Sequence, residues 1–303
     1  MFKQALRAAP AAAAILMALT GSAGATNLIT NGTFATNGLT DYAGPGSGIS
    51  QTYRYAVAVN GATNTSEIAG WTYNVPGGNG QNNGGLLTVV SSNNLNSSFN
   101  MVDTCCNLGF WGAGNGGLAT LTAPPSGAAN VLAQDSAPEN AAYLSQTING
   151  LTPNAHYRLT FNFAGLQLRS LDGSLWNGDT NEGAIANLGG TYDTSAPGGT
   201  ASQAFVGGQT DTYVYAGYTN AVPSHGFTGW QQVSMDFTAT SASEVLNLEA
   251  ISTSAGEPPF ALIDNVQMFS VPEPASWSLM VIGAGVLGGF ARRRRAGAPA
   301  AAT

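Results

Sequence analysis

Residues 156–164 read HYRLTFNFA, and polar and apolar side chains alternate from His156 to Phe163. Tyr157, Leu159, Phe161 and Phe163 occupy every second position. Successive side chains of a β-strand point to opposite faces of a sheet, so these four apolar groups would share one face. The alternation predicts a half-buried strand with an aromatic-rich core face.

Short runs of strand-forming residues recur on both sides of this strand, separated by turns rich in Gly, Asn and Pro. We expect strands at 27–34, 51–59, 68–75, 86–90, 141–148, 184–188, 212–218, 230–238, 244–252 and 260–269, with loops at 91–117 and 165–180. No long segment shows the 3.6-residue period of an amphipathic helix. Many short strands with turn signals between them predict an all-β sandwich or barrel.

The N-terminal 25 residues have the order of a secretory signal peptide. Lys3 and Arg7 precede an apolar run at 8–19, and Ala23 and Ala25 form a small-x-small cleavage site. We therefore expect residues 1–25 to be removed during export.

The C-terminal tail reads VPEPASWSLMVIGAGVLGGFARRRR over residues 271–295. Its uncharged part, 275–291, would form a single hydrophobic helix of about 25 Å, slightly short of the roughly 30 Å hydrocarbon core of a bilayer. Four arginines follow and should remain cytoplasmic. An ordinary single-pass anchor, or a core helix before a basic surface run, is the alternative.

A Pro-Glu-Pro box, an apolar segment and an arginine run in this order resemble the PEP-CTERM sorting signal of Gram-negative bacteria, on which an exosortase acts. The resemblance implies export across the inner membrane, a transient anchor there, and release to the cell surface or the extracellular space. The residues that carry it are Pro272, Glu273, Pro274, Trp277, Arg292, Arg293, Arg294 and Arg295. The expected organisation is a signal peptide at 1–25, one domain at 26–270, the sorting signal at 271–295 and an extension at 296–303.

Charge is sparse once both signals are set aside. Six of the nine basic residues lie in them, and 15 of the 16 acidic residues do not. The remaining stretch, about 245 residues and long enough for a real core, has three arginines, no lysine and a net charge of about −12. This composition argues against nucleic acid, which needs clustered Lys and Arg, and against acidic polymers held by charge.

The two cysteines, Cys105 and Cys106, are adjacent. Neighbouring Cα atoms lie about 3.8 Å apart, which is shorter than the usual span across a disulfide. A strained vicinal disulfide, two free thiols and a bridge to a partner all remain open. The spacing does not fit a zinc site.

Several segments look like a galactose-binding-like jelly roll of the kind found in carbohydrate-binding modules. They are NLITNGTF (27–34), IAGWTY (68–73), SQTINGLTPNAHYRLTFNFAG (145–165), GFTGWQQVSMDFTATS (226–241) and FALIDNVQM (260–268). The resemblance implies a jelly-roll β-sandwich in which the first and last strands lie side by side. It implies a non-catalytic protein that binds neutral carbohydrate or exopolysaccharide. A purely structural biofilm-matrix protein and a polysaccharide-acting enzyme are the alternatives.

Candidate ligand-binding residues come from Gly-rich loops that carry tryptophan. An exposed indole can stack on the apolar face of a sugar while amide and carboxylate groups bind its hydroxyls. The candidates are Trp111, Trp176, Asp172, Asn177, Asp179 and Asp135. The tryptophans could instead seal the loops onto the sandwich, and Asp135 could form a turn. Trp71 and Trp230 lie in strand contexts and are expected to pack in the core.

Asp264, in the closing strand, is a candidate ligand of a structural Ca²⁺. In jelly-roll carbohydrate modules an Asp here often holds calcium together with oxygens of the first strand. Calcium takes six to eight oxygens, and Ala35 stands where the family pattern NGxFE has a glutamate. Asp264 could instead cap a turn. No other cofactor is expected.

No catalytic motif is present. The chain lacks His-Glu-x-x-His, Gly-x-Ser-x-Gly and Walker patterns. His156 begins a strand and His225 lies in a Pro-Ser-His-Gly turn. Asp179 and Glu182 could form a glycosidase carboxylate pair, but their spacing in a loop is a weak signal. We therefore expect no catalytic residues.

Overall fold

The computed structural model describes residues 26–35, 41–42, 53–56, 63–64, 68–74, 87–96, 101–102, 107–136, 143–170, 177–192, 205–215, 222–252 and 259–271. The described part of the chain contains no helix long and apolar enough to cross a membrane. Several predictions fall outside these residues. They concern Ala23 and Ala25, Cys105 and Cys106, Asp172 and Trp176, and the tail with Pro272, Glu273, Pro274, Trp277 and Arg292 to Arg295.

Two sheets make up the fold. The first has the order β1 (Asp41–Tyr42), β2 (Tyr53–Ala56), β5 (Leu87–Ser91), β8 (Asn130–Asp135), β17 (Pro259–Ser270), β10 (His156–Ser170), β7 (Asn107–Phe110) and β6 (Met101–Val102), with β15 (Gln231–Thr238) paired to β10. The second has the order β14 (Gln209–Val214), β11 (Gly183–Leu188), β16 (Ser243–Ile251), β9 (Tyr143–Asn149), β4 (Thr72–Asn74) and β3 (Thr63–Asn64). A hairpin of β12 (Thr191–Tyr192) and β13 (Phe205–Val206) and two 3₁₀ turns, Ser92–Asn94 and Ala113–Asn115, complete the described elements.

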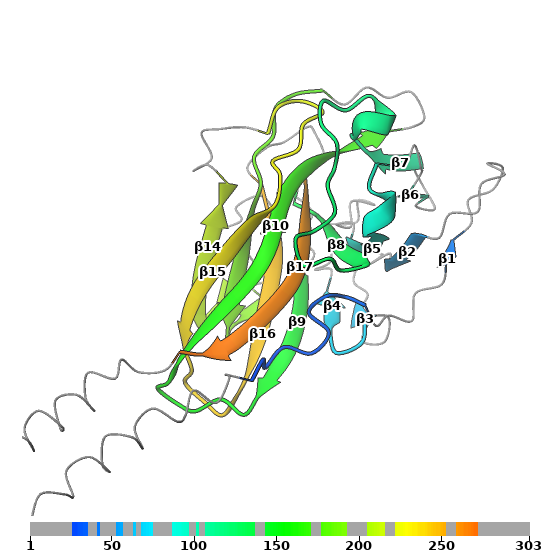
Figure 1. The fold of residues 1–303 in the computed structure, drawn as a ribbon. Coiled ribbons are helices and arrows are strands. Elements are labelled where there is room, and N and C mark those ends of the chain that lie inside the picture. The colour runs from blue at the N-terminus through cyan, green and yellow to red at the C-terminus, as the bar shows by residue number, and fades with distance from the viewer. Residues whose placement is uncertain are drawn as a thin grey trace, which may run out of the picture.

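The expected all-β jelly-roll sandwich is confirmed. From β9 to β11, and again from β14 to β17, the chain changes sheet at each step. The neighbouring strands pair antiparallel, as β10 with β17, β11 with β16 and β16 with β9. Figure 1 shows β15, β10 and β17 side by side, with β16 and β9 in the second layer.

The main core lies between the two sheets and contains the face predicted from residues 156–164. Tyr157, Leu159, Phe161 and Phe163 are all buried there. Trp71 joins them at 2% exposure, and its indole NH donates to the carbonyl of Asn31. Burial of aromatic and aliphatic groups on this scale is the main force that holds the sheets together.

A second apolar cluster covers the opposite face of the first sheet. Leu166 and Leu168 of β10 and Phe260 of β17 pack there against Leu95 and Leu121, from the segment between β5 and β8. The expected loops at 91–117 and 165–180 were therefore partly wrong. β10 continues to Ser170 because its apolar positions change face after residue 164, and β7 pairs with its end.

The strand expected at 27–34 is irregular. Asn31 and Phe34 have φ values of 53° and 54°, which break the extended conformation. The segment nevertheless runs beside β17, since the NH of Leu28 donates to the carbonyl of Met268 at 2.9 Å and the NH of Val266 donates to that of Gly32 at 2.9 Å. The side-by-side placement of the first and last segments is confirmed without a regular strand.

Two further differences from the predicted strands have local causes. β8 was not expected, because its apolar residues face both clusters and do not alternate. In β17 a bulge shifts the register with β10 between Thr160 and Asn162, and Asn265 adopts φ 53°. One extra residue in the bulged strand reverses the face on which later side chains lie. Asp264 precedes the bulge and lies with Leu262 on the side of the second apolar cluster, whereas Val266 beyond the bulge faces the main core.

Candidate functional site at one end of the sandwich

Trp111 follows β7 directly and is almost fully buried, with 6% of its surface exposed. Its ring stacks on the imidazole of His225, with a centroid separation of 3.5 Å and an interplanar angle of 19°. The Cζ atom of Arg169 lies 5.2 Å from the centroid of the same indole, within range of a cation–π contact. The buried indole therefore contacts both His225 and Arg169. We call these three residues, with Asp179, the Trp111–His225 site.

His225 is held from both sides of its backbone. Its NH donates to Oε1 of Gln167 at 2.6 Å, and its carbonyl accepts from the NH of Leu118 at 2.9 Å. Its φ of 64° lies in the left-handed region, which a residue with a Cβ rarely adopts. Strain of this kind persists only where surrounding contacts maintain it, and it often marks a functional residue. The half-buried imidazole is thus presented in one orientation.

Asp179 is brought to His225 by the turn that contains Ser224. The NH of Ser224 donates to Oδ1 of Asp179 at 2.9 Å, and Oγ of Ser224 accepts from the NH of Gly178 at 3.0 Å. Asp179 and the nearby Asn177 are both exposed. Trp111 and Asp179, predicted from different loops, are therefore connected through the Pro-Ser-His-Gly turn, which was not among the predicted binding residues.

A buried polar chain lies behind the site. Nε2 of Gln167 donates to the carbonyl of Gly178 and to Oγ1 of Thr180, each at 2.9 Å. The hydroxyl of Thr180 donates in turn to Oε1 of Glu182 at 2.5 Å. Hydrogen bonds therefore connect the backbone of His225 to a carboxyl group in the interior.

Glu182 is fully buried, and its Oε2 has no hydrogen-bond partner. That oxygen packs against β10, where a Cβ on Gly165 would lie only 2.8 Å away. Burial raises the pKa of Glu182 to about 8, against a smaller opposing effect of the Thr180 hydrogen bond. Asp179 is exposed, so the two carboxyl groups do not face a common open site as a glycosidase pair would.

Asp135 is the last residue of β8, where it stands opposite Phe260 of β17 in the sheet register. It is buried, at 7% exposure. The residue thus belongs to a strand of the first sheet. The sequence instead predicted a turn or a binding loop at this position.

Asp264 is fully buried beneath the segment that precedes β8. Its Oδ2 accepts from the hydroxyl of Ser126 and from Nδ2 of Asn162, while Oδ1 has no partner. Burial raises its pKa, and these hydrogen bonds oppose the rise. The described residues contain no group of three or more His, Cys, Asp or Glu that could hold a metal. One carboxylate, an amide and a hydroxyl fall short of the six to eight oxygens that calcium takes, so these residues do not fit that ion well.

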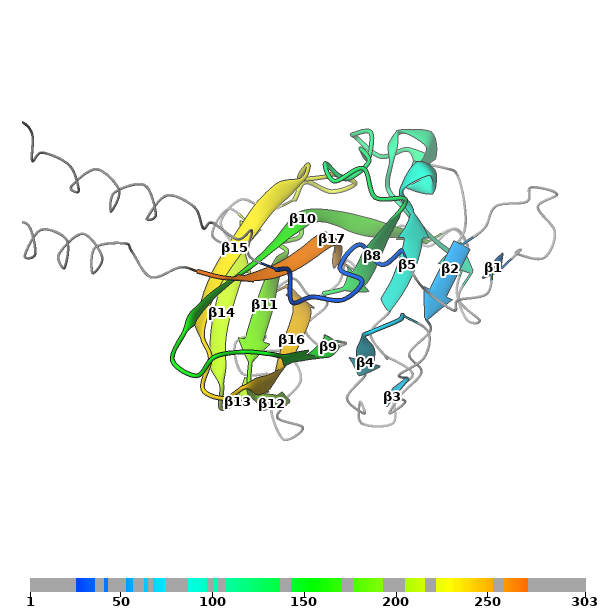
Figure 2. The same ribbon diagram turned by 60° about the horizontal axis from the view of Figure 1, so that its bottom comes forward.

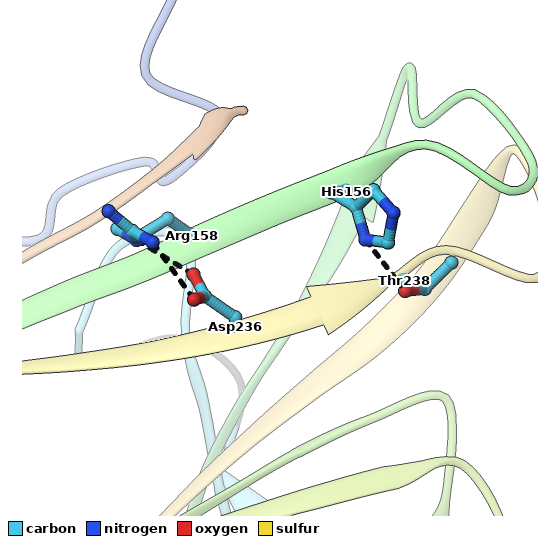
Figure 3. A network of polar contacts seen from close by, with 4 residues as sticks. All are labelled: His156, Arg158, Asp236 and Thr238. Carbon is cyan, nitrogen blue, oxygen red and sulfur yellow. Dashed lines mark hydrogen bonds and ion pairs between the residues drawn. The ribbon is translucent and has the colours of Figure 1, made fainter. Parts of the chain in front are cut away.

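The other histidine belongs to an exposed polar network on β10 and β15 (Figure 3). Nδ1 of His156 lies 3.0 Å from Oγ1 of Thr238. Next to them Arg158 binds both carboxylate oxygens of Asp236, at 2.7 and 2.9 Å. Their side chains are 51% and 60% exposed, so solvent weakens this ion pair. The network lies on an ordinary solvated sheet face.

The sequence patterns did not indicate His225 and Arg169 of the site, or Gln167 behind it. Only His225 could have been found from the sequence, because the Pro-Ser-His-Gly pattern predicts a turn, and a turn can project a histidine beyond the sheet. Gln167 and Arg169 lay in a segment expected to be a loop, where their strand positions were not recognised.

Comparison with protein families identifies the tail. Residues 270–295 match the PEP-CTERM protein-sorting motif. The motif implies export and membrane-anchored sorting through an exosortase. No curated protein sequence matches the chain.

Solved structures resemble the chain only distantly. TmCBM61 in complex with β-1,4-galactotriose is 11% identical, with a TM-score of 0.36 over 81% of this chain and 99% of that one. The CBM22-1 xylan-binding domain of Paenibacillus barcinonensis Xyn10C is 15% identical, with a TM-score of 0.26 over 48% and 74%. Arabinose-bound MgGH51 α-L-arabinofuranosidase is 12% identical, with a TM-score of 0.34 over 83% of this chain but 27% of the enzyme. Likeness at these levels assigns no ligand to this chain.

Proposed function

We propose that the protein is an exported, non-catalytic binding protein that holds neutral polysaccharide at the Trp111–His225 site. An exosortase-type protease would process its tail at the inner membrane, and the domain would then act at the cell surface or in the extracellular matrix. The observation that carries the proposal is the fixed position of His225, stacked on Trp111 at 3.5 Å and bonded through its NH to Gln167.

The chemistry of the site suits a sugar. The imidazole of His225 is a flat ring held in one orientation, on which the apolar face of a pyranose can stack. This pre-organisation lowers the entropy lost on binding. Asp179 and Asn177 are exposed nearby and can bind hydroxyl groups. A net charge of about −12 outside the two signals disfavours an acidic polymer, which leaves a neutral one as the better ligand.

Affinity electrophoresis through gels that contain neutral polysaccharides tests the proposal. We expect the purified protein to be retarded by at least one such polymer. His225→Ala should lose at least ten-fold in affinity and Asp179→Ala a few-fold. Thr238→Ala, on the exposed face of Figure 3, should migrate as the wild type. Normal migration of the wild type in every gel, or full retardation of His225→Ala, would contradict the proposal.

A further inference from the structure

A second cluster of aromatic residues lies on the outer face of the other sheet. The β12–β13 hairpin folds over this face beside β16 (Figure 2). Two asparagines of adjacent strands hold it there: Nδ2 of Asn187 donates to the carbonyl of Gly207 at 3.0 Å, and Nδ2 of Asn247 donates to that of Gly190 at 3.2 Å. Oδ1 of Asn187 also accepts from the NH of Gly190 at 2.9 Å. These hydrogen bonds therefore fix the hairpin to the outer face of the second sheet.

Three aromatic rings meet where the hairpin crosses the sheet. Tyr192 stacks on Tyr143, with centroids 5.0 Å apart and an interplanar angle of 9°. Phe205 stands perpendicular to both, at 5.4 Å from Tyr143 and 5.6 Å from Tyr192. All three are half-buried, and the next residue, Val206, is 58% exposed. The cluster thus extends from the sheet to the molecular surface, where an apolar group is open to a ligand.

A buried carboxyl group lies next to Tyr143. Glu249 stands opposite Tyr143 in the pairing of β16 with β9, so both side chains lie on the same face. Glu249 is 3% exposed, and its Oε2 has no hydrogen-bond partner. Burial raises its pKa to about 8. The pKa of Tyr143 is raised by burial and then by the charge of Glu249, as expected for close neighbours.

Packing alone does not account for this carboxyl group. A buried polar atom left unpaired costs free energy that an apolar side chain of the same size would not. The two arginines whose side chains are described are engaged elsewhere, Arg158 with Asp236 and Arg169 at Trp111. Outside the two signals the chain has no lysine. Among the residues whose side chains the structure describes, none supplies a cation to Glu249, so a bound ammonium ion is the group that would hold this carboxyl ionised.

Electron-rich ring faces beside a carboxylate are the surroundings that favour an ammonium ion on an apolar frame. We propose that Tyr143, Tyr192, Phe205 and Glu249 form a binding site for an organic ammonium ion, such as the amino group of an amino sugar. This site belongs to the second sheet and is independent of the proposed function at Trp111 and His225.

Isothermal titration calorimetry with three probes tests the proposal: a glucosamine oligomer, its fully N-acetylated counterpart and choline. We expect the glucosamine oligomer or choline to bind and the uncharged N-acetylated oligomer to bind at least ten-fold more weakly. Tighter binding of the oligomer than of choline indicates an amino sugar as the source, and the reverse indicates a small quaternary amine. Equal binding of both oligomers, or binding of neither ammonium probe, would overturn the proposal.

Variants assign any binding to this site. Glu249→Gln keeps the shape of the side chain and removes the carboxyl group that would pair with the ammonium ion, and it should weaken ammonium binding at least ten-fold. Tyr192→Ala should weaken it similarly. Asp236→Asn removes one carboxylate from the opposite sheet and should leave binding unchanged, which controls for net charge. If Tyr192→Ala fails to fold, Glu249→Gln alone decides, and wild-type affinity in that variant refutes the site. Retardation by neutral polysaccharide should persist in Glu249→Gln, so the two proposals fail separately.

Discussion

The main-chain NH of His225 donates to Oε1 of Gln167 at 2.6 Å, so a buried amide of β10 holds the residue that stacks on Trp111. The same amide also donates to Gly178 and Thr180. One side chain thus joins three segments of the chain at one end of the sandwich.

Gln167→Met should therefore damage both stability and binding. The substitution keeps the length of the side chain but leaves the NH of His225 and the carbonyl of Gly178 without partners. Unsatisfied buried groups cost roughly 1–3 kcal/mol each, with incomplete additivity. We expect a loss of about 2–4 kcal/mol in urea unfolding and a loss of polysaccharide retardation comparable with that of His225→Ala. An unchanged unfolding midpoint would show that the amide does not hold this end together.

Stability should fall as pH rises from about 4.5 to 8. Glu182 and Glu249 have pKa values raised to about 8 in the folded protein, whereas they ionise near 4.5 when exposed in the unfolded chain. Between these values the unfolded state loses protons that the folded state retains, so each group lowers the free energy of unfolding, by at most about 1.4 kcal/mol per pH unit. Below this window both states are protonated and the effect vanishes.

The double variant Glu182→Gln and Glu249→Gln isolates this effect. Its unfolding free energy, measured in urea from pH 4 to 9, should vary less with pH than that of the wild type. Parallel curves for the two proteins would exclude these carboxyl groups as the cause.

Gly32→Ala should detach the first segment from β17. A Cβ at this position would lie 1.9 Å from the carbonyl oxygen of Val266, which belongs to the bulge of β17. Overpacking of this kind costs about 1–3 kcal/mol. Hydrogen exchange should accelerate at the amides of Leu28 and Val266, which bond across this contact. Wild-type protection at both amides would argue that the backbone adapts without cost.

Asp236→Asn should change stability little at neutral pH. Hydrogen bonds from Arg158 lower the pKa of Asp236, so the ion pair contributes above that pKa and is lost as pH falls through it. Both side chains are more than half exposed, where solvent and salt screen the interaction. We expect urea midpoints that agree closely at pH 7 in 0.15 M salt. A large loss would mean that the exposed face of Figure 3 has a structural role.

Much of the fold was predictable because many strands follow from the pattern of neighbouring residues in the sequence. The alternation in 156–164 marked the core face of β10, and similar runs marked β15, β16 and β17. The continuation of β10 was missed because Leu166 and Leu168 pack on the other face, under a segment that no local pattern assigns to them. β8 was missed for the related reason that both of its faces are covered.

The site was predictable only in part. Trp111 was predicted as a tryptophan in one Gly-rich loop and Asp179 as a polar residue beside Trp176 in another, and the fold connects Trp111 and Asp179 through Ser224 and His225. The sequence left open whether Trp111 would be exposed for stacking or would seal its loop onto the sandwich. The structure shows it covered, and this could not be predicted because the cover comes from His225, more than a hundred residues away.

The sequence by itself determined the β class, the acidic, lysine-free domain and the sorting signal at 270–295, since each rests on composition or on the order of neighbouring residues. Only the tertiary structure decided that His225 stacks on Trp111 and that Tyr192 and Phe205 pack on Tyr143, the cross-strand neighbour of Glu249. Alternation defines which face of a strand is apolar. Which strands pair and where a loop packs depend on the free energy of the whole chain, so a local pattern does not determine them.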